Sequence, residues 1–237
     1  MERHTIHGKI LDAPPPPPAP LIQRFAAHPP VAAYDAMGRH GAMHHEIKPI
    51  SSGVRICGPA LTVWTRATDA LFVLKSSERI RPGDVIVVDA AGVKEFCCMG
   101  DRIAWYFKRA GAAGVVVDGG VRDVAAIRET GLPVFSRSIA MPLWPAQGPG
   151  AINVDIQCGG MPVQPGDLIL GDDDGVVVVP REDCERVIEL VDAHQRLEEQ
   201  RHERMLAGES YIDAMGMTDK VRFWTDAEAA DRGHWGR

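Results

Sequence analysis

The sequence of 237 residues has little of several features that mark particular classes of protein. It has no run of about 20 apolar residues that could span a bilayer, and its amino terminus has no apolar stretch typical of a signal peptide. It has only five cysteines, an odd number that includes the adjacent Cys97 and Cys98, and it has no Cys-x-x-Cys motif. We therefore expect neither a disulfide framework nor a thiolate zinc site, and a reduced, cytoplasmic protein is the economical interpretation.

Basic charge is also scarce, with 26 Lys and Arg against 32 Asp and Glu and a net charge of −6. Broad binding of nucleic acids or anionic membranes needs dense basic patches, so we expect no nucleic-acid and no membrane partner. The sequence lacks a G-x-G-x-x-G dinucleotide motif, a Walker A motif and a G-x-S-x-G motif. Without a nucleotide-binding glycine loop, a methyltransferase has little support, and a small molecule or another protein chain is the expected partner.

What the sequence does contain is an α/β pattern with a hydrophobic content of 45%, enough for a sizeable core. Short β-branched runs flanked by Gly or Pro predict buried strands. The predicted strands are Leu61–Trp64, Val85–Asp89, Val115–Asp118, Val134–Phe135, Leu168–Leu170 and Val176–Val179. Helical spacing over Asp101–Ala113 places a helix between the second and third strands, which makes a βαβ unit with parallel strands.

This pattern predicts one compact domain over residues 30–180, preceded by an arm at 1–29 and followed by a helical extension at 181–237. The arm is expected to be flexible over residues 1–20 and contains a polyproline segment, Pro14–Pro18. Short helices are predicted around Leu21–Ala27 and Val31–Arg39, and a long one over Glu182–Arg204. The latter is mostly polar beyond Ala193, which is typical of a solvated face or of a contact with a neighbouring subunit.

The most informative residues follow two neighbouring strands. Gly100-Asp101 begins the predicted helix, and Arg122-Asp123 follows the next strand. Ligands of open parallel sheets bind beyond the carboxyl ends of the strands, so both pairs should lie at one site. The amides of the helix start suit a carboxylate, Arg122 adds a planar donor, and Asp123 is a hard ligand for Mg²⁺ or Mn²⁺.

An alternative interpretation needs no chemistry at all. Asp is a common N-cap residue, so Asp101 and Asp123 could cap two helices while Arg122 is an ordinary surface residue.

Asp101 followed, after twenty residues, by Arg122-Asp123 resembles the signature of the class II pyruvate aldolases that cleave 4-hydroxy-4-methyl-2-oxoglutarate and 4-carboxy-4-hydroxy-2-oxoadipate. These enzymes belong to the family of the regulator of ribonuclease activity A (RraA-like). The similar segments, which span about residues 30–205, are YDAMGRHGAM (34–43), ICGPALTV (56–63), RPGDVIVVD (81–89), GVVVDGGVRD (114–123) and QPGDLILGDDDGVVVVP (164–180). The resemblance implies a swivelling three-layer β/β/α domain, flanked here by the amino-terminal arm and the carboxy-terminal helix, and assembly as a homotrimer or homohexamer.

The resemblance also implies roles for these residues. Asp123 would bind a divalent metal, Mg²⁺ or Mn²⁺, and Arg122 the carboxylate or keto oxygen of a small-molecule 2-oxo acid substrate. Gly100, Asp101, Arg102 and Ile103 would form the substrate-binding turn, with Asp101 also positioning a water on the metal as the proton carrier. The catalytic residues would thus be Asp101 and Arg122. A Glu from a neighbouring subunit also reaches the site in these aldolases, and Glu199 is its nearest match.

The implied reaction is cleavage of a 4-hydroxy-2-oxo diacid by a carbon–carbon lyase that releases pyruvate through its enolate. Oxaloacetate decarboxylation passes through the same enolate and is either a side activity or the main one. A Schiff base on Lys94 ranks second because that lysine has no evident activating partner. The other class of function is a non-catalytic, protein-binding regulator of a ribonuclease, which the presence of Asp123 and the long helix counts against.

Other patterns are given structural interpretations. His40 and His44 are four residues apart, but Gly38 and Gly41 weaken a shared helix, so we expect no metal site there. Asp172–Gly175 is interpreted as a hairpin turn rather than a calcium loop.

Cys97 and Cys98 are interpreted as buried thiols, although a position before a helix start could make them reactive. Residues 91–99 differ from the Gly-rich loop of the better-known aldolases, at the place where the distal half of the substrate could rest.

Overall fold

The computed structural model describes residues 8–67, 69–143 and 146–220. The helices are α1 (Ala19–Ala26), α2 (Pro30–Ala36), α3 (Leu71–Ser76), α4 (Asp101–Arg109), α5 (Val124–Thr130), α6 (Cys184–Leu206) and α7 (Tyr211–Ala214), with 3₁₀ turns at Arg181–Asp183 and Thr218–Lys220. The strands are β1 (Gly8–Ile10), β2 (Lys48–Pro49), β3 (Ile56–Thr65), β4 (Val85–Met99), β5 (Gly114–Val121), β6 (Val134–Ile139), β7 (Gly150–Ile152), β8 (Ile156–Cys158), β9 (Met161–Val163), β10 (Leu168–Asp172) and β11 (Gly175–Val179).

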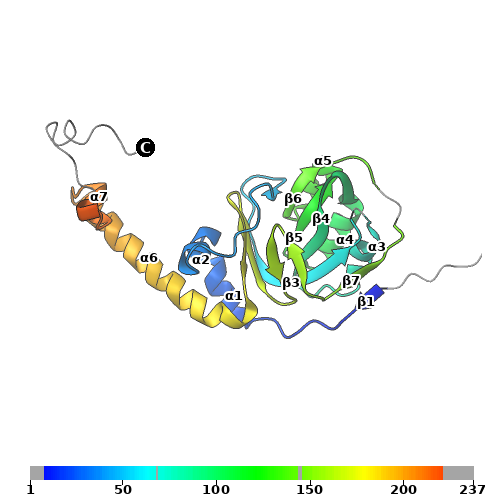
Figure 1. Cartoon of the computed structure of the whole chain (residues 1–237), viewed down its shortest axis with the longest axis horizontal. Coiled ribbons are helices and arrows are strands. Elements are labelled where there is room, and N and C mark those ends of the chain that lie inside the picture. Colours follow the sequence, from blue (N-terminus) through cyan, green and yellow to red (C-terminus); the bar gives the residue numbers. More distant parts are fainter. Residues whose placement is uncertain (1–7, 68, 144–145, 221–237) are drawn as a thin grey trace, which may run out of the picture. The chain divides into compact units, whose positions relative to one another are not determined.

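A large sheet forms the centre of the fold, with its strands in the order β1-β7-β3-β4-β5-β6-β2 (Figure 1). The four strands from β3 to β6 are parallel, and β7 and β2 flank them in the antiparallel direction. All six strands expected from the sequence are present, and α4 joins β4 to β5 as the βαβ pattern predicted. The carboxyl ends of the parallel strands consequently share one edge of the sheet.

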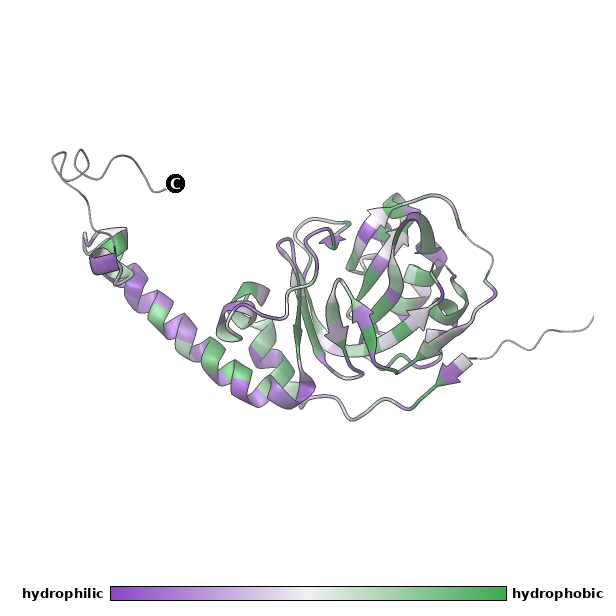
Figure 2. Cartoon of the chain, in the orientation of Figure 1, coloured by the Kyte–Doolittle hydropathy of each residue, from purple (hydrophilic) through white to green (hydrophobic). Residues whose placement is uncertain are grey.

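The side chains of this sheet enter two separate cores. One core lies between the sheet and α3, α4 and α5, and it includes Val88, Phe107 and Val117. The other lies between the sheet and a second β layer made of β10, β11 and the β8–β9 hairpin, and it includes Val87 and Phe135. Figure 2 shows hydrophobic residues, in green, along the strands of the central sheet. The structure thus confirms the expected three-layer β/β/α arrangement.

Strand β3 connects the two β layers. Its first half pairs antiparallel with β10, and its second half pairs parallel with β4. At Gly58 the strand passes so close to a turn that a Cβ atom would lie 2.1 Å from the carbonyl oxygen of Gly83. A glycine is needed here because any side chain would collide with backbone rather than with a movable group.

The amino-terminal arm is held against the domain over its described residues, so the expectation of a flexible arm is wrong from residue 8 onward. Strand β1 pairs in parallel with β7. The Arg81 guanidinium donates to the carbonyl oxygens of Ala13 and Pro14, both at 3.0 Å, and Asn153 donates to the carbonyl of Leu11 at 2.9 Å. No local sequence pattern indicates these contacts, because they depend on side chains from distant segments.

The long carboxy-terminal helix is confirmed, and α6 begins at Cys184 after a 3₁₀ turn. Its first part packs Val187, Ile188 and Val191 against α1 and β10 in a third apolar cluster. One compact unit extends to Val191, and a second begins at Asp192. None of the helices in the described part of the chain is long and apolar enough to cross a membrane.

The two Pro-Gly-Asp segments of the sequence form matching turns. Gly83 and Gly166 have φ values of +94° and +85°, in the region that favours glycine. In each turn the Asp side chain accepts a hydrogen bond from the backbone N–H three residues earlier, Asp84 from Arg81 at 2.7 Å and Asp167 from Gln164 at 2.8 Å. Both carboxylates are buried, and burial raises the pKa of Asp84 to about 6.

This raised pKa predicts a pH-dependent stability. The folded state favours the protonated form of Asp84. The stability that this protonation contributes is therefore fully present below the ordinary Asp pKa of about 3.9 and is lost as pH rises through about 6. The free energy of unfolding of Asp84→Asn, measured relative to wild type, should therefore rise by about 1–2 kcal/mol when the pH is raised from 4.5 to 7.5, allowing for solvent screening. Urea unfolding at the two pH values measures this difference. Asp155→Asn, at an exposed position, is the control, and an equal change there would contradict the assignment.

Candidate functional site

A cleft of about 810 Å³ lies where β4 and β5 end and α4 and α5 begin. Its walls come from residues 98–103 and 122–126, with Ala70 and Leu74 from the α3 region and Leu143 and Ala146 from the segment after β6. The cleft therefore brings together every site residue expected from the sequence apart from Glu199. That residue lies in α6 beyond Val191, where it is exposed and accepts a hydrogen bond from Gln195 at 3.3 Å.

The meeting of the two halves of the site depends on an irregular strand. Asp89 pairs with Asp118 and Met99 pairs with Val121, so ten steps along β4 match only three along β5. The intervening part of β4 bulges away, and the strand returns to register just before Gly100. The backbone N–H of Arg122 then donates to the carbonyl of Met99 at 3.1 Å, which joins the ends of the two strands.

Asp123 is the most constrained residue of the cleft. Its backbone is left-handed, with φ 58° and ψ 37°, a conformation that a non-glycine residue keeps only where its surroundings fix it. Its carboxylate oxygen Oδ2 lies 3.3 Å from Nε of Arg122. A Cβ atom on Gly100 would come within 2.4 Å of the same Oδ2, so the carboxylate packs directly against the glycine backbone.

The interpretation of these aspartates as ordinary caps is not supported. Asp123 occupies the N-cap position of α5, but its side chain makes no capping hydrogen bond. Asp101 is the first residue of α4 and not its cap, which is Gly100. Because glycine has no side chain to accept from them, the amides of the first turn of α4 remain available to a ligand in the cleft.

Asp69 holds the opposite wall of the cleft together and was missed from the sequence. It is 1% exposed, and its carboxylate accepts hydrogen bonds from the backbone of Leu71 at 2.8 Å, Gln147 at 2.6 Å and Gly148 at 2.9 Å. It thereby ties the start of α3 to the segment that supplies Ala146. These partners are nearly 80 residues apart in sequence, so no local pattern could have indicated them.

A charged network lies on the other face of the sheet and includes Lys94, the residue considered for a Schiff base. Its ammonium pairs with Glu46, whose other oxygen accepts from Arg137 at 3.0 Å, and Arg137 also pairs with the buried Asp118. The hydrogen bond from Lys94 keeps the pKa of Glu46 below its usual value. Residues 91–97 do not line the cleft, so this segment and Lys94 are removed from the place expected for the distal half of a substrate.

Cys97 and Cys98 are buried thiols, as expected, and His40 and His44 lie outside the helices. Burial raises the pKa of the Cys98 thiol to about 12 and also raises that of Cys97, so neither is a reactive thiolate. Helix α2 ends at Ala36, and His40 and His44 therefore do not share a helix face. No group of three His, Cys, Asp or Glu side chains is arranged to hold a metal ion among the described residues.

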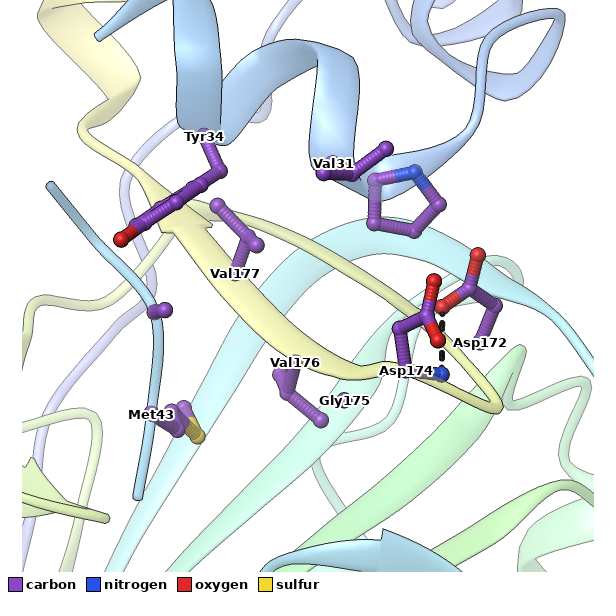
Figure 3. A pocket seen from close by; sticks show the side chains of 10 residues that line it. Val31, Tyr34, Met43, Asp172, Asp174, Gly175, Val176 and Val177 are labelled. Carbon is purple, nitrogen blue, oxygen red and sulfur yellow. Dashed lines mark hydrogen bonds between the residues drawn. The ribbon is translucent and has the colours of Figure 1, made fainter. Parts of the chain in front are cut away.

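A smaller hollow of about 130 Å³ lies between α2 and the β10–β11 hairpin (Figure 3). Tyr34 and Val31 face it from the helix, and Asp172 and Asp174 lie at the turn. Asp172 accepts from the backbone N–H of Asp174 at 3.0 Å, and the carbonyl of Asp174 accepts from Lys48 at 2.5 Å. The expected hairpin turn is confirmed, and its polar groups serve the turn.

The contact between Gly100 and Asp123 gives a direct test of the cleft. Gly100→Ala places a methyl group where the carboxylate now lies, so Asp123 must rotate away while the fold loses little stability. If Asp123 binds a divalent cation, Mn²⁺ affinity should fall at least about 10-fold, the scale of lost support around a metal ligand. Calorimetric titration measures the affinity and thermal unfolding the stability. Ala125→Ser, elsewhere in the cleft, should keep wild-type affinity, and unchanged affinity in Gly100→Ala would contradict the packing argument.

Comparison with known proteins agrees with this geometry. The family model RraA-like, described as Aldolase/RraA, matches residues 30–178. A protein of Halalkalibacterium halodurans named "Putative 4-hydroxy-4-methyl-2-oxoglutarate aldolase" is 37% identical over 199 residues, covering 82% of this chain and 95% of that protein.

Two solved structures extend the likeness to the fold. Streptomyces coelicolor RraAS2, described as an unusual member of the RNase ES inhibitor RraA protein family, matches with a TM-score of 0.68 and 31% identity, over 79% of this chain and 99% of that one. An uncharacterized protein from Pseudomonas syringae pv. tomato matches with a TM-score of 0.74 and 25% identity, over 85% of this chain and 100% of that one. With its α/β fold, its cleft and these relatives, the chain belongs to the RraA-like family of aldolases and RraA proteins.

Proposed function

We propose that this protein is a divalent-metal-dependent class II pyruvate aldolase that cleaves a 4-hydroxy-2-oxo diacid and releases pyruvate. The observation that supports this most directly is the packing of the Asp123 carboxylate against Gly100, which unites Arg122, Asp123 and the first turn of α4 in one cleft. A 2-oxo acid has a carboxylate next to a ketone oxygen. The cleft supplies complementary groups for both.

The substrate carboxylate would bind the amides at the start of α4. Helix N-termini attract anions because their first amides lack partners and the helix dipole is positive there. The Arg122 guanidinium, 39% exposed at the cleft, would donate to the ketone oxygen. That oxygen gains negative charge as the carbon–carbon bond breaks, so a donor fixed beforehand lowers the barrier more than it strengthens substrate binding.

Asp123 would hold the metal, Mg²⁺ or Mn²⁺. Its side chain is 41% exposed in a cleft with room for water, and one carboxylate suits a hard cation that keeps most of its ligands as water or substrate oxygens. When bound, the ion would act as a Lewis acid that stabilises charge on the ketone oxygen. The Arg122 side chain, held 3.3 Å from the Asp123 carboxylate, would lie beside the ion and donate to the same ketone oxygen.

Cleavage breaks the bond between C3 and C4 of the substrate. The C4 hydroxyl loses its proton as the carbonyl product forms, and C3 of the pyruvate enolate gains one. We assign to Asp101 the orientation of the water through which this proton moves. Asp101 begins α4 and is the second carboxylate that lines the cleft, beside Asp123. Oxaloacetate decarboxylation gives the same enolate and would be supported by the same groups.

We also propose a homotrimer or homohexamer in which Glu199 of one copy completes the site of a neighbour. Large apolar side chains lie exposed near the ends of the strands and on α4, as interfaces require: Met141 is 83% exposed, and Trp105 and Tyr106 are each 53% exposed.

A pyruvate-release assay with 4-carboxy-4-hydroxy-2-oxoadipate and with oxaloacetate tests the proposed reaction. Wild-type protein with Mg²⁺ should release pyruvate, and EDTA should abolish the release. Asp123→Asn keeps the side-chain shape but removes the charge, and it should slow turnover by about 10²–10³-fold, the scale for loss of a contact that stabilises an oxyanion. Asp155→Asn is the control. Metal-independent turnover, or full activity in Asp123→Asn, would contradict the proposal.

A second candidate function is a protein-binding regulator of a ribonuclease. The likeness to RraAS2 favours it, because that protein is described as belonging to an RNase inhibitor family. Co-purification with a ribonuclease, together with no pyruvate release from either 2-oxo acid, would select this function.

A further inference from the structure

Two arginines lie at the cleft, and they differ in their partners. Arg122 pairs with Asp123 at 3.3 Å. Arg102 also lines the cleft, but it is exposed and makes neither a hydrogen bond nor an ion pair within the described ranges. Its guanidinium is therefore available to a ligand without breaking an existing contact.

The dipole of α4 disfavours the positive charge of Arg102 in the free protein. Arg102 is the second residue of α4, where the positive end of the helix dipole disfavours a cation, and Arg122 lies at the same cleft. The basic residues that complement this dipole, Lys108 and Arg109, lie in the last turn. An anion bound beside Arg102 would reverse the penalty.

The cleft has room for such an anion. Its volume of about 810 Å³ far exceeds what a three-carbon 2-oxo acid fills, since pockets of this size hold much larger ligands. Arg102 also lines an adjoining groove of about 580 Å³ between α4 and α5, so it stands at the rim that the two hollows share. In the groove Arg102 faces the carboxylates of Asp101 and Glu129 alone, whereas in the cleft Arg122 adds a second positive charge against Asp101 and Asp123, so the cleft side of Arg102 favours an anion more.

We propose that the Arg102 side chain binds the distal carboxylate of the substrate and makes the enzyme selective for 2-oxo diacids over 2-oxo acids with an uncharged distal end. This inference rests on the proposed function and adds a specificity-determining residue to it. The amides of α4 and Arg122 hold the pyruvyl end, and Arg102 holds the far end. Because the distal carboxylate does not react, its contact should act mainly on KM.

Two substrates that differ only at the distal end give a sharp test. 4-Hydroxy-2-oxoglutarate and 4-hydroxy-2-oxopentanoate both release pyruvate on retro-aldol cleavage, but only the first ends in a carboxylate. The quantity measured is the ratio of their kcat/KM values. Arg102→Gln should lower this ratio by about 10–100-fold, through KM, since a charge-assisted hydrogen bond is lost. Arg102→Lys, which keeps the charge, should restore part of it.

The control is Arg109→Gln, which removes the other arginine of α4. Its guanidinium lies over the Trp105 ring, 4.9 Å from the ring centroid, and it does not line the cleft. It should leave the ratio at the wild-type value. An unchanged ratio in Arg102→Gln would overturn the inference, as would an equal fall in Arg109→Gln. Dissociation of an oligomer in Arg102→Gln with an unchanged ratio would assign the arginine to a subunit contact instead. Thermal unfolding should show no loss of stability, because Arg102 is exposed and makes no hydrogen bond or ion pair in the described part of the chain.

Failure of the proposed function would be visible separately. If wild-type protein with Mg²⁺ releases pyruvate from neither substrate, the aldolase proposal fails, and calorimetric titration with 2-oxoglutarate and 2-oxopentanoate then decides the role of Arg102. Tighter binding of the diacid, lost in Arg102→Gln, would support the inference. Equal affinities for the two acids would overturn it.

Discussion

The return of β4 to its pairing with β5 is the constraint on which the rest of the site depends. The strand leaves register after Asp89 and rejoins at Met99, where the carbonyl accepts the backbone N–H of Arg122. That single junction places the start of α4 beside the start of α5. Once there, Gly100 lets the Asp123 carboxylate lie against the backbone, and the helix amides and two arginines face one space. A shift of either strand by one residue would turn these side chains to the wrong face of the sheet.

Contacts on both faces of the sheet surround this junction. On one face, apolar packing beneath α4 and α5 fixes the helices, and Asp69 ties the opposite wall of the cleft to α3. On the other face, Arg137 and Asp118 pair at the place where the bulged part of β4 crosses, and Glu46 connects that pair to Lys94. Buried charges are costly unless paired, and the pairing with Arg137 satisfies the buried carboxylate of Asp118. The cleft itself keeps unpaired polar groups where a ligand can reach them, as sites built for binding do.

The elements that could be predicted were those with a strong local signal. Buried β-branched runs fixed the six principal strands, and apolar spacing fixed α4 and most of α6. The short helices α3 and α5, of six and seven residues, gave no such signal, because fewer than two turns show no clear period. Strands β1, β7, β8 and β9 have three residues each and owe their pairing to neighbours elsewhere in the chain. The amino-terminal arm was misjudged for the same reason, since Arg81 holds it from a distant turn.

The sequence by itself determined the chemistry of the candidate site: a helix-start Gly100-Asp101 and an Arg122-Asp123 pair after the next strand, whose carboxyl ends must share an edge in a parallel sheet. Local spacing was enough because both pairs adjoin strongly patterned strands. Only the tertiary structure decided what surrounds them. It paired Lys94 with Glu46, kept residues 91–97 out of the cleft lining, built the far wall from Asp69 and its partners, and left Arg102 unpaired at the rim. These outcomes depend on a strand bulge and on contacts between segments far apart in the chain, and no short-range pattern encodes either.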